Sequence, residues 1–145
     1  MLLDRRYGDL AIARELARVR REQGQMSVIV FDVDPRTSGD AVPGSTPDPL
    51  AVVGEMLTRA MRGSDLAIRW SGEEVLVVLP GLSVTEAHHV AERVRAAMQA
   101  GARDRVAVSG GVAALLPDET FEAVVARANE KVRLARDRGH NRIAS

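Results

Sequence analysis

The stretch from Leu66 to Pro80, LAIRWSGEEVLVVLP, constrains the fold more than any other part of this 145-residue sequence. Two runs of strand-forming residues, Leu66–Trp70 and Val75–Leu79, flank a short polar segment. That segment holds the turn dipeptide Ser71-Gly72 and the acidic pair Glu73-Glu74, so it predicts a β-hairpin with two carboxylates just after its bend. The second run lacks polar alternation, which is typical of a strand covered on both faces. On this stretch alone, an ordinary hairpin with solvent-facing glutamates is the simpler interpretation.

Further helices and strands are expected on both sides of the hairpin. Apolar periodicity and capping residues predict helices over Asp9–Glu22, from Asp48-Pro49 to about Met61, from Ser83 to about Ala100 and from Thr120 to about Arg138. Strands are predicted over Ser27–Val33 and from Val106 into Leu115, with a short edge strand in Asn141–Ala144. Four prolines and two glycines predict a loop over Pro35–Pro49. The order of these elements predicts an α+β, ferredoxin-like fold, an antiparallel sheet with helices on one face.

Composition limits the classes of protein to consider. A length of 145 residues predicts one domain, and 46% hydrophobic residues are enough for a core. Lys+Arg and Asp+Glu both number 20, so no global field favours nucleic acid polymers or anionic membranes. The absence of cysteine excludes disulfides and thiolate chemistry. No apolar run reaches the ~18 residues of a membrane span, so we expect a cytoplasmic domain.

Two carboxylates are candidates for a metal site. Asp32 ends the first predicted strand and Glu73 lies at the tip of the hairpin, and these strands are neighbours in a ferredoxin-like sheet. Two carboxylates with a backbone carbonyl form a hard oxygen site that suits Mg²⁺ and bound phosphates. Such a site suits phosphoryl transfer. The alternative is that the two acids are unrelated surface residues at strand ends.

Several motifs in order along the chain resemble the GGDEF domains, the diguanylate cyclases that condense two GTP into cyclic di-GMP. Residues 69–75, RWSGEEV, resemble the family signature R-Y-G-G-D/E-E-F. The other matching segments are Leu3–Tyr7 (L-x-N-R-R), Phe31–Asp34 (D-x-D), Val108–Ala113 (S-x-G-V-A) and Ala128–Arg142 (A-D-x-A-L-Y-x-A-K-x-x-G-R-N). Each match is weak alone, but the ordered set covers almost the whole chain. The resemblance implies the palm-type fold of that family, in agreement with the ferredoxin-like prediction.

The resemblance also assigns roles to individual residues. It implies that Asp32 and Glu73 bind Mg²⁺ or Mn²⁺ with the carbonyl of Val33. Glu74 corresponds to the second acid of the signature, close to the substrate, so Glu73 and Glu74 are the expected catalytic residues. Gly72 is retained where a side chain would crowd the nucleotide.

Other positions depart from the family. Ser71 replaces the first glycine of the signature. Pro35–Asp40 lacks the phosphate-binding Lys and guanine-binding Asn expected after D-x-D. Asp48 corresponds to a later guanine-binding Asp in an uncertain alignment. Arg136 stands for a phosphate-binding Lys, and His140 replaces an Arg. The resemblance therefore implies that the metal-binding residues of the site are retained and that the residues expected to bind the guanine base are replaced.

A second site is implied nine residues before Ser71. Arg62 and Asp65 form an R-x-x-D at the spacing of the family's product-binding inhibitory site. Arginine can pair with guanine O6 and N7, and a carboxylate can accept from the guanine N–H edge. Arg93 resembles the additional arginine of such a site. The alternative is a helix C-terminal arginine and a turn aspartate without a ligand.

The residues leave several functions open. We expect a cyclic di-GMP signalling domain with weak or absent cyclase activity that binds cyclic di-GMP at the R-x-x-D site. An active diguanylate cyclase using Mg²⁺ is the alternative, and a structural dimerisation module is a third interpretation. The expected partners are GTP or cyclic di-GMP and a second copy of the chain, when ligand-bound or in the full-length protein. The family's usual upstream sensor is lacking, so residues 1–145 are also interpreted as a fragment of a longer protein.

Overall fold

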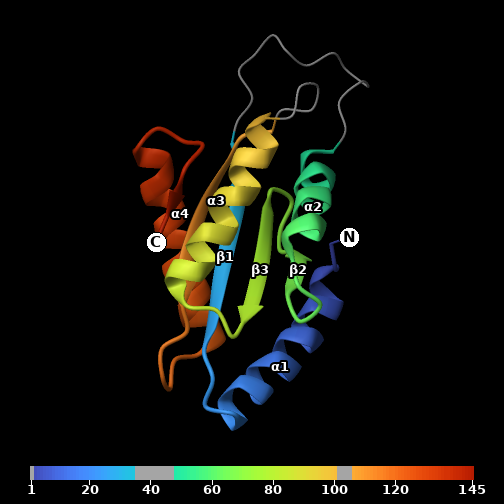
Figure 1. The fold of residues 1–145 in the computed structure, drawn as a ribbon, viewed down its shortest axis with the longest axis vertical. Coiled ribbons are helices and arrows are strands. Elements are labelled where there is room, and N and C mark those ends of the chain that lie inside the picture. Colours follow the sequence, from blue (N-terminus) through green and yellow to red (C-terminus); the bar gives the residue numbers. More distant parts are fainter. Residues whose placement is uncertain (1, 35–47, 101–105) are drawn as a thin grey trace.

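The computed structural model describes residues 2–34, 48–100 and 106–145, and Figure 1 shows their arrangement. Within these ranges the chain forms four helices and five strands. In chain order they are α1 (Arg5–Arg21), β1 (Met26–Val33), α2 (Pro49–Ala60), β2 (Leu66–Arg69), β3 (Glu74–Pro80), α3 (Val84–Ala100), β4 (Val108–Ala114), α4 (Phe121–Asp137) and β5 (Ile143–Ala144). The predicted loop over Pro35–Pro49 lies outside the described residues except for its last two positions.

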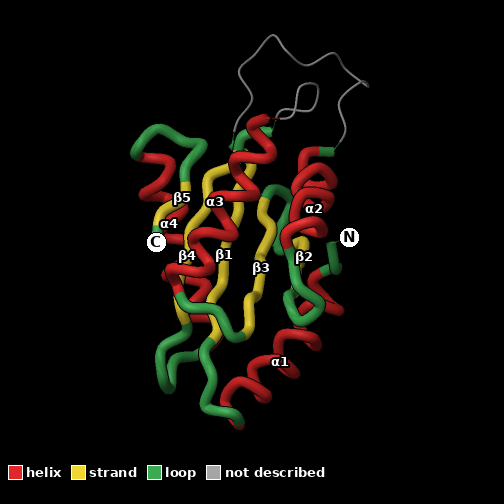
Figure 2. Tube along the Cα trace, in the orientation of Figure 1, coloured by secondary structure: helices red, strands yellow, loops and turns green. Residues whose placement is uncertain are grey.

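The five strands form one sheet in the order β2-β3-β1-β4-β5, drawn in yellow in Figure 2. β1 lies between β3 and β4 and pairs antiparallel with both. β2 and β3 form the predicted hairpin. The predicted edge strand is present as β5, which pairs parallel with β4 and makes the sheet mixed. The ferredoxin-like α+β prediction is therefore confirmed.

Helices cover both faces of the sheet (Figure 1). The core helices α2 and α3 pack on one face, as predicted, against Ile29, Phe31 and Val77. The outer helices α1 and α4 cover the opposite face, against Val28 and Val30 of β1 and against residues of β3 and β4. Alternate residues of β3 therefore enter two different apolar layers, which explains why its sequence lacks polar alternation.

The helix boundaries follow from capping side chains. The predicted caps Asp48, Thr120 and the reciprocal pair Ser83–Glu86 are all present. α1 begins four residues before its predicted start at Asp9, because the Asp4 carboxylate accepts a hydrogen bond from the Tyr7 amide at 2.9 Å. In the part of the chain that the structure describes, no helix has the length and apolar character needed to cross a membrane.

Candidate active site at the end of the central strand

The sheet register brings the predicted carboxylates together. Asp32 lies directly opposite Glu74 in the β1–β3 ladder. The next residue, Val33, donates its amide hydrogen to the carbonyl oxygen of Glu73 at 3.2 Å. Because the N–H and C=O of one strand residue point to the same side, the Val33 carbonyl also faces the Glu73 backbone. The ladder therefore places Val33 beside Glu73 and Asp32 opposite Glu74.

A cavity of about 600 Å³ opens beside these carboxylates. It collects residues from the end of β1, the start of α2, the hairpin turn and the end of α4. Its lining residues are Val33, Asp34, Asp48, Pro49, Leu50, Gly72, Glu73, Arg136 and His140. Five residues predicted from the sequence thus line one cavity, although Asp48 and Arg136 come from helices that contribute no residue to the signature.

Ser71 and Gly72 form the hairpin turn beside the cavity. A Cβ added at Gly72 would meet no atom of the described residues within 4 Å, so packing among them does not require glycine there. The space above Gly72 is open toward the cavity. The Ser71 hydroxyl donates a hydrogen bond to Glu74 Oε1 at 2.7 Å, so the serine that replaces a signature glycine binds the second signature acid.

Arg136 contacts the carboxylate that was predicted to bind metal. Its Nη2 lies 2.9 Å from Asp32 Oδ2, and its Nε lies 3.9 Å from Asp34 Oδ1. The resemblance implied a phosphate ligand at this position and did not predict an ion pair with Asp32. Asp32 Oδ1 and Arg136 Nε are both buried, and neither has a hydrogen-bond partner among the residues that the structure describes.

The environment of Asp32 disfavours its charged form. Burial raises the pKa of the Asp32 carboxyl above its ordinary value, and the nearby charges of Glu74, Glu73 and Asp34 raise it further. The guanidinium of Arg136 opposes these effects and lowers the same pKa. A cation bound beside Asp32 would therefore stabilise its ionised form.

Asp34 is a residue of the site to which the sequence assigned no role. It is 6% exposed and accepts hydrogen bonds from the Ser109 hydroxyl and the Asn141 amide, both at 2.8 Å. His140 and Asn141 adopt positive φ angles of 64° and 49°, which non-glycine residues rarely do. Asp34 therefore stabilises the turn that brings His140 to the cavity. The available signal was the D-x-D spacing, which puts Asp32 and Asp34 on one face of the strand.

Asp48 makes two contacts within the chain. Its Oδ1 accepts from the Leu50 amide at 3.1 Å and caps α2, while its Oδ2 pairs with Arg69 at 3.1 Å. Arg69 is the arginine that opens the signature segment. The pairing holds the start of α2 against the hairpin and brings Asp48 to the cavity where a guanine-binding role was expected.

The donor set around Asp32 fits a hard divalent cation. Its atoms are carboxylate oxygens of Asp32 and Glu73 and the carbonyl oxygen of Val33, which are the ligand types that Mg²⁺ prefers. Asp32 Oδ1 is the atom of this set that has no hydrogen-bond partner within residues 2–34, 48–100 and 106–145. The described residues contain no cluster of three or more His, Cys, Asp or Glu side chains able to hold a metal by themselves. The set therefore fits an ion that takes its remaining ligands from water and phosphate.

The two R-x-x-D residues, Arg62 and Asp65, form an ion pair with each other. Arg62 Nη2 lies 2.9 Å from Asp65 Oδ1, and the Arg62 amide donates to Asp65 Oδ2 at 2.9 Å. The same Nη2 donates to the carbonyl oxygen of Pro80 at 2.7 Å. Asp65 is 7% exposed, whereas Arg93 lies exposed on α3. The geometry brings Arg62 and Asp65 into one unit, and it gives Arg93 no part in the contacts that hold Arg62.

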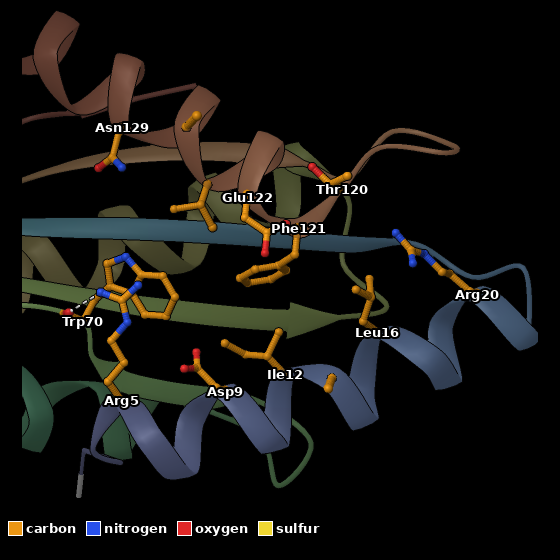
Figure 3. Close-up of a pocket in the computed structure, with 13 residues that line it drawn as sticks. Arg5, Asp9, Ile12, Leu16, Arg20, Trp70, Thr120, Phe121, Glu122 and Asn129 are labelled. Carbon is orange, nitrogen blue, oxygen red and sulfur yellow. Dashed lines mark hydrogen bonds between the residues drawn. The ribbon is translucent and has the colours of Figure 1, made fainter.

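A separate groove of about 650 Å³ runs between α1 and α4 (Figure 3). None of the predicted site residues lines it. At one end, the Arg5 guanidinium lies 3.7 Å from the centre of the Trp70 ring and donates to the Trp70 carbonyl at 3.1 Å. Trp70 immediately precedes Ser71, so this contact connects α1 to the hairpin turn.

The fold and this cavity define an α+β domain with an oxygen-ligand site where the central strand meets a hairpin turn. Comparison with known proteins gives the family: the sequence model described as "Diguanylate cyclase, GGDEF domain" matches residues 1–142. This chain belongs to the GGDEF family of diguanylate cyclase domains.

Individual relatives agree with this assignment. Diguanylate cyclase DosC of Escherichia coli (strain K12) is 30% identical over 153 residues, covering 98% of this chain and 33% of that protein. Diguanylate cyclase DgcP of Pseudomonas aeruginosa is 29% identical over 140 residues, covering 91% of this chain and 21% of that protein. The chain thus spans between about a fifth and a third of the length of these relatives.

Solved structures share the fold. Diguanylate cyclase SiaD from Pseudomonas aeruginosa, solved with its activator SiaC, superposes with a TM-score of 0.84 at 26% identity, covering 99% of this chain and 58% of that one. The GGDEF domain of DgcB from Caulobacter crescentus, solved with c-di-GMP, gives 0.84 at 20% identity, covering 99% and 88%. At 20% identity the second likeness concerns the fold alone.

Proposed function

We propose that this chain is a cyclic di-GMP signalling domain that binds GTP with a divalent metal at Asp32 and Glu73, binds cyclic di-GMP at Arg62 and Asp65, and turns GTP over slowly or not at all. The observation that carries the proposal is one cavity lined by Val33, Gly72, Glu73 and Arg136, in which Arg136 also pairs with the neighbouring Asp32. We further propose that residues 1–145 are one domain of a longer cytoplasmic protein, since GTP is a cytoplasmic metabolite and the chain spans a minor part of its relatives.

The proposed roles follow from the chemistry of each group. Asp32, Glu73 and the Val33 carbonyl would hold Mg²⁺ or Mn²⁺, and such an ion neutralises triphosphate charge and favours loss of a hydroxyl proton. Gly72 leaves room for the nucleotide beside the hairpin turn. Arg136 offers a planar guanidinium to phosphate oxygens, which it can pair in a bidentate manner. Asp48 reaches the same cavity as an acceptor for a guanine N–H edge.

The R-x-x-D unit supplies the proposed regulatory ligand site. The Asp65 carboxylate is nearly buried and holds the half-exposed Arg62 guanidinium in place, so Arg62 can donate to the O6 and N7 acceptors of a guanine edge. Calorimetry with cyclic di-GMP is expected to show binding that Arg62→Ala weakens by about 1–3 kcal/mol, the usual range for a bidentate base contact.

Arg59→Ala is the matched control, because Arg59 is an exposed arginine in the last turn of α2. Equal affinities of the wild type and Arg62→Ala would place the ligand elsewhere. Thermal unfolding of Arg62→Ala separates lost binding from lost structure, since Arg62 also donates to the Pro80 carbonyl.

An active diguanylate cyclase is the second candidate function. One observation favours it: the retained acids Asp32, Glu73 and Glu74 lie together at the end of β1, with Glu74 directly opposite Asp32. Incubation with GTP and Mg²⁺, followed by chromatography of the nucleotides, distinguishes the two functions. The same chromatography identifies any ligand carried through purification.

A further inference from the structure

We propose that Arg136 is a displaceable counter-ion of Asp32, so that a divalent cation alone binds weakly and a cation accompanied by a phosphate chain binds strongly. In this proposal the cation and the Arg136 guanidinium compete for Asp32, and an anion relieves the competition by drawing Arg136 to itself. The inference rests on the proposed nucleotide site and concerns how that site discriminates metal–nucleotide from free metal.

The geometry of the pair is that of a single, incomplete contact. Arg136 Nη2 lies 2.9 Å from Asp32 Oδ2, but Asp32 Oδ1 and Arg136 Nε are buried without hydrogen-bond partners in the described part of the chain. A bidentate arginine–carboxylate pair would have used both oxygens and two nitrogens. Leaving a buried donor and a buried acceptor unpaired is costly, so this contact is poorly suited to a purely structural role.

Asp34 cannot complete the contact. Its Oδ1 already accepts from the Ser109 hydroxyl and its Oδ2 from the Asn141 amide. Arg136 Nε stays 3.9 Å from Asp34 Oδ1, beyond hydrogen-bond distance. The guanidinium is therefore held near two carboxylates while it makes one good bond to one of them.

The two unpaired atoms, Asp32 Oδ1 and Arg136 Nε, carry opposite charge and would bind different ligands. Asp32 Oδ1 requires a cation or a donor, and Arg136 Nε requires an acceptor. A cation and an anion bound together would supply both at once, whereas a cation alone would leave Arg136 without its partner and in electrostatic repulsion with the bound ion. The site is thus complementary to a metal–phosphate pair and opposed to the free metal.

The test compares the wild type with Arg136→Met and Arg136→Lys. Electron paramagnetic resonance of free Mn²⁺ measures binding of Mn²⁺ without nucleotide, and calorimetry measures GTP binding in the presence of Mg²⁺. Arg133→Met is the matched control, because Arg133 is an exposed arginine of the same helix that pairs with Glu130. Circular dichroism checks that each variant is folded.

We expect Arg136→Met to bind Mn²⁺ at least about tenfold more tightly than the wild type, because a unit positive charge next to the ligand is removed. The same variant is expected to bind GTP more weakly. Arg136→Lys keeps the charge and should keep Mn²⁺ binding weak, and Arg133→Met should behave as the wild type. A merely structural Arg136 would weaken both ligands in Arg136→Met.

Folded Arg136→Met with Mn²⁺ affinity equal to or below that of the wild type overturns the inference. If the wild type still binds GTP with Mg²⁺ in that case, the proposed function stands without it. If the wild type binds neither GTP nor Mn²⁺ and Arg136→Met binds no Mn²⁺, both the inference and the proposed nucleotide site are wrong.

Discussion

Ser71 restrains an acid of the signature turn. Its hydroxyl donates to Glu74 Oε1 at 2.7 Å, in a position where the family has a glycine that could make no such bond. We expect Ser71→Gly to bind GTP with Mg²⁺ more tightly, because Glu74 is released and the Cβ is removed. One hydrogen bond contributes about 0.5–1.5 kcal/mol, which is roughly two- to tenfold in affinity.

Ser71→Ala separates the two causes, because it removes the hydroxyl and keeps the Cβ. Calorimetry on both variants would show equal gains if the hydrogen bond alone matters. A GTP affinity of Ser71→Ala that matches the wild type would mean that Glu74 is not restrained by the serine in solution.

Asp32 makes the stability of the domain depend on pH. Burial and the neighbouring acids raise its pKa in the folded chain above the ordinary value of 3.8. The folded chain then keeps a proton at a pH where the unfolded chain has lost it, so the free energy of unfolding falls as the pH rises from near 3.8 through the raised pKa. The Asp32→Asn side chain cannot ionise, so the free energy of unfolding of this variant does not fall with pH for this reason.

Urea denaturation at several pH values between about 4 and 7 checks this prediction without added metal. The difference in free energy of unfolding, wild type minus Asp32→Asn, is expected to decrease as the pH rises, whatever its starting value. Glu55→Gln, in an exposed position of α2, serves as the control substitution. A difference that is constant or increases with pH would contradict the prediction.

At the scale of elements, α4 lies against β4 with its backbone almost in contact. A Cβ on Gly111 would come within 2.0 Å of the Ala128 carbonyl oxygen, and the rigid backbone cannot yield at that distance. Gly111→Ala is therefore expected to displace α4 and to lower the free energy of unfolding by about 1–3 kcal/mol or more.

Gly72→Ala is the matched glycine substitution, because its Cβ would have no neighbour within 4 Å in the part of the chain that the structure describes. Its free energy of unfolding should stay within about 0.5 kcal/mol of the wild type, while its GTP affinity should fall. Chemical denaturation and calorimetry measure the two quantities. Equal destabilisation by both substitutions would contradict the packing argument.

The elements could be predicted from the sequence because each has a local signal. β3 is apolar at every position from Val75 to Leu79, and this pattern predicted a strand covered on both faces, although the ferredoxin-like arrangement predicted helices on one face only. Asp48, Ser83 and Thr120 marked three helix starts through capping chemistry. The predicted start of α1 at Asp9 is too late, because apolar periodicity does not extend to the first turn, which the Asp4 cap determines.

The contacts inside the site could not be predicted from local signals. Arg136 and Asp32 are neighbours only because α4 crosses β1 and β4 on the face that Asp32 and Asp34 share. The bond from the Asn141 amide to Asp34 joins residues 107 positions apart and depends on the turn after α4. Residue types and spacing pointed to these residues as part of a site, but only the tertiary structure determines which atoms they contact.

For the whole molecule, we expect cyclase turnover by this chain to be absent or far below that of an efficient enzyme. Condensing two GTP requires the 3′-hydroxyl of one nucleotide to meet the α-phosphate of the other across a dimer. Such positioning supplies ~7–11 kcal/mol of barrier reduction, and an error of ~1 Å can cost about a hundredfold. In Pro35–Asp40, Thr, Ser, Gly and Asp replace the expected loop residues that bind phosphate and guanine.

Chromatography of GTP incubated with the chain and Mg²⁺ measures this turnover, with Glu73→Ala as the background control. Steady accumulation of cyclic di-GMP at an ordinary enzymatic rate, abolished in Glu73→Ala, would contradict the prediction. That result would also show that the residues expected to bind guanine are dispensable.

The pairing of Leu3 with β2 determines how the domain would carry a mechanical load. The Leu3 amide donates to the Ala67 carbonyl at 2.9 Å, and the Arg69 amide donates to the Leu3 carbonyl at 2.8 Å. A pull on the chain at Leu2 is therefore borne by two hydrogen bonds to a four-residue strand that ends two residues before Ser71. A pull at Ser145 instead enters the sheet at its opposite edge, through β5. The two ends therefore differ mechanically, because tension applied at Leu2 is transmitted through β2 to the turn that carries Glu73.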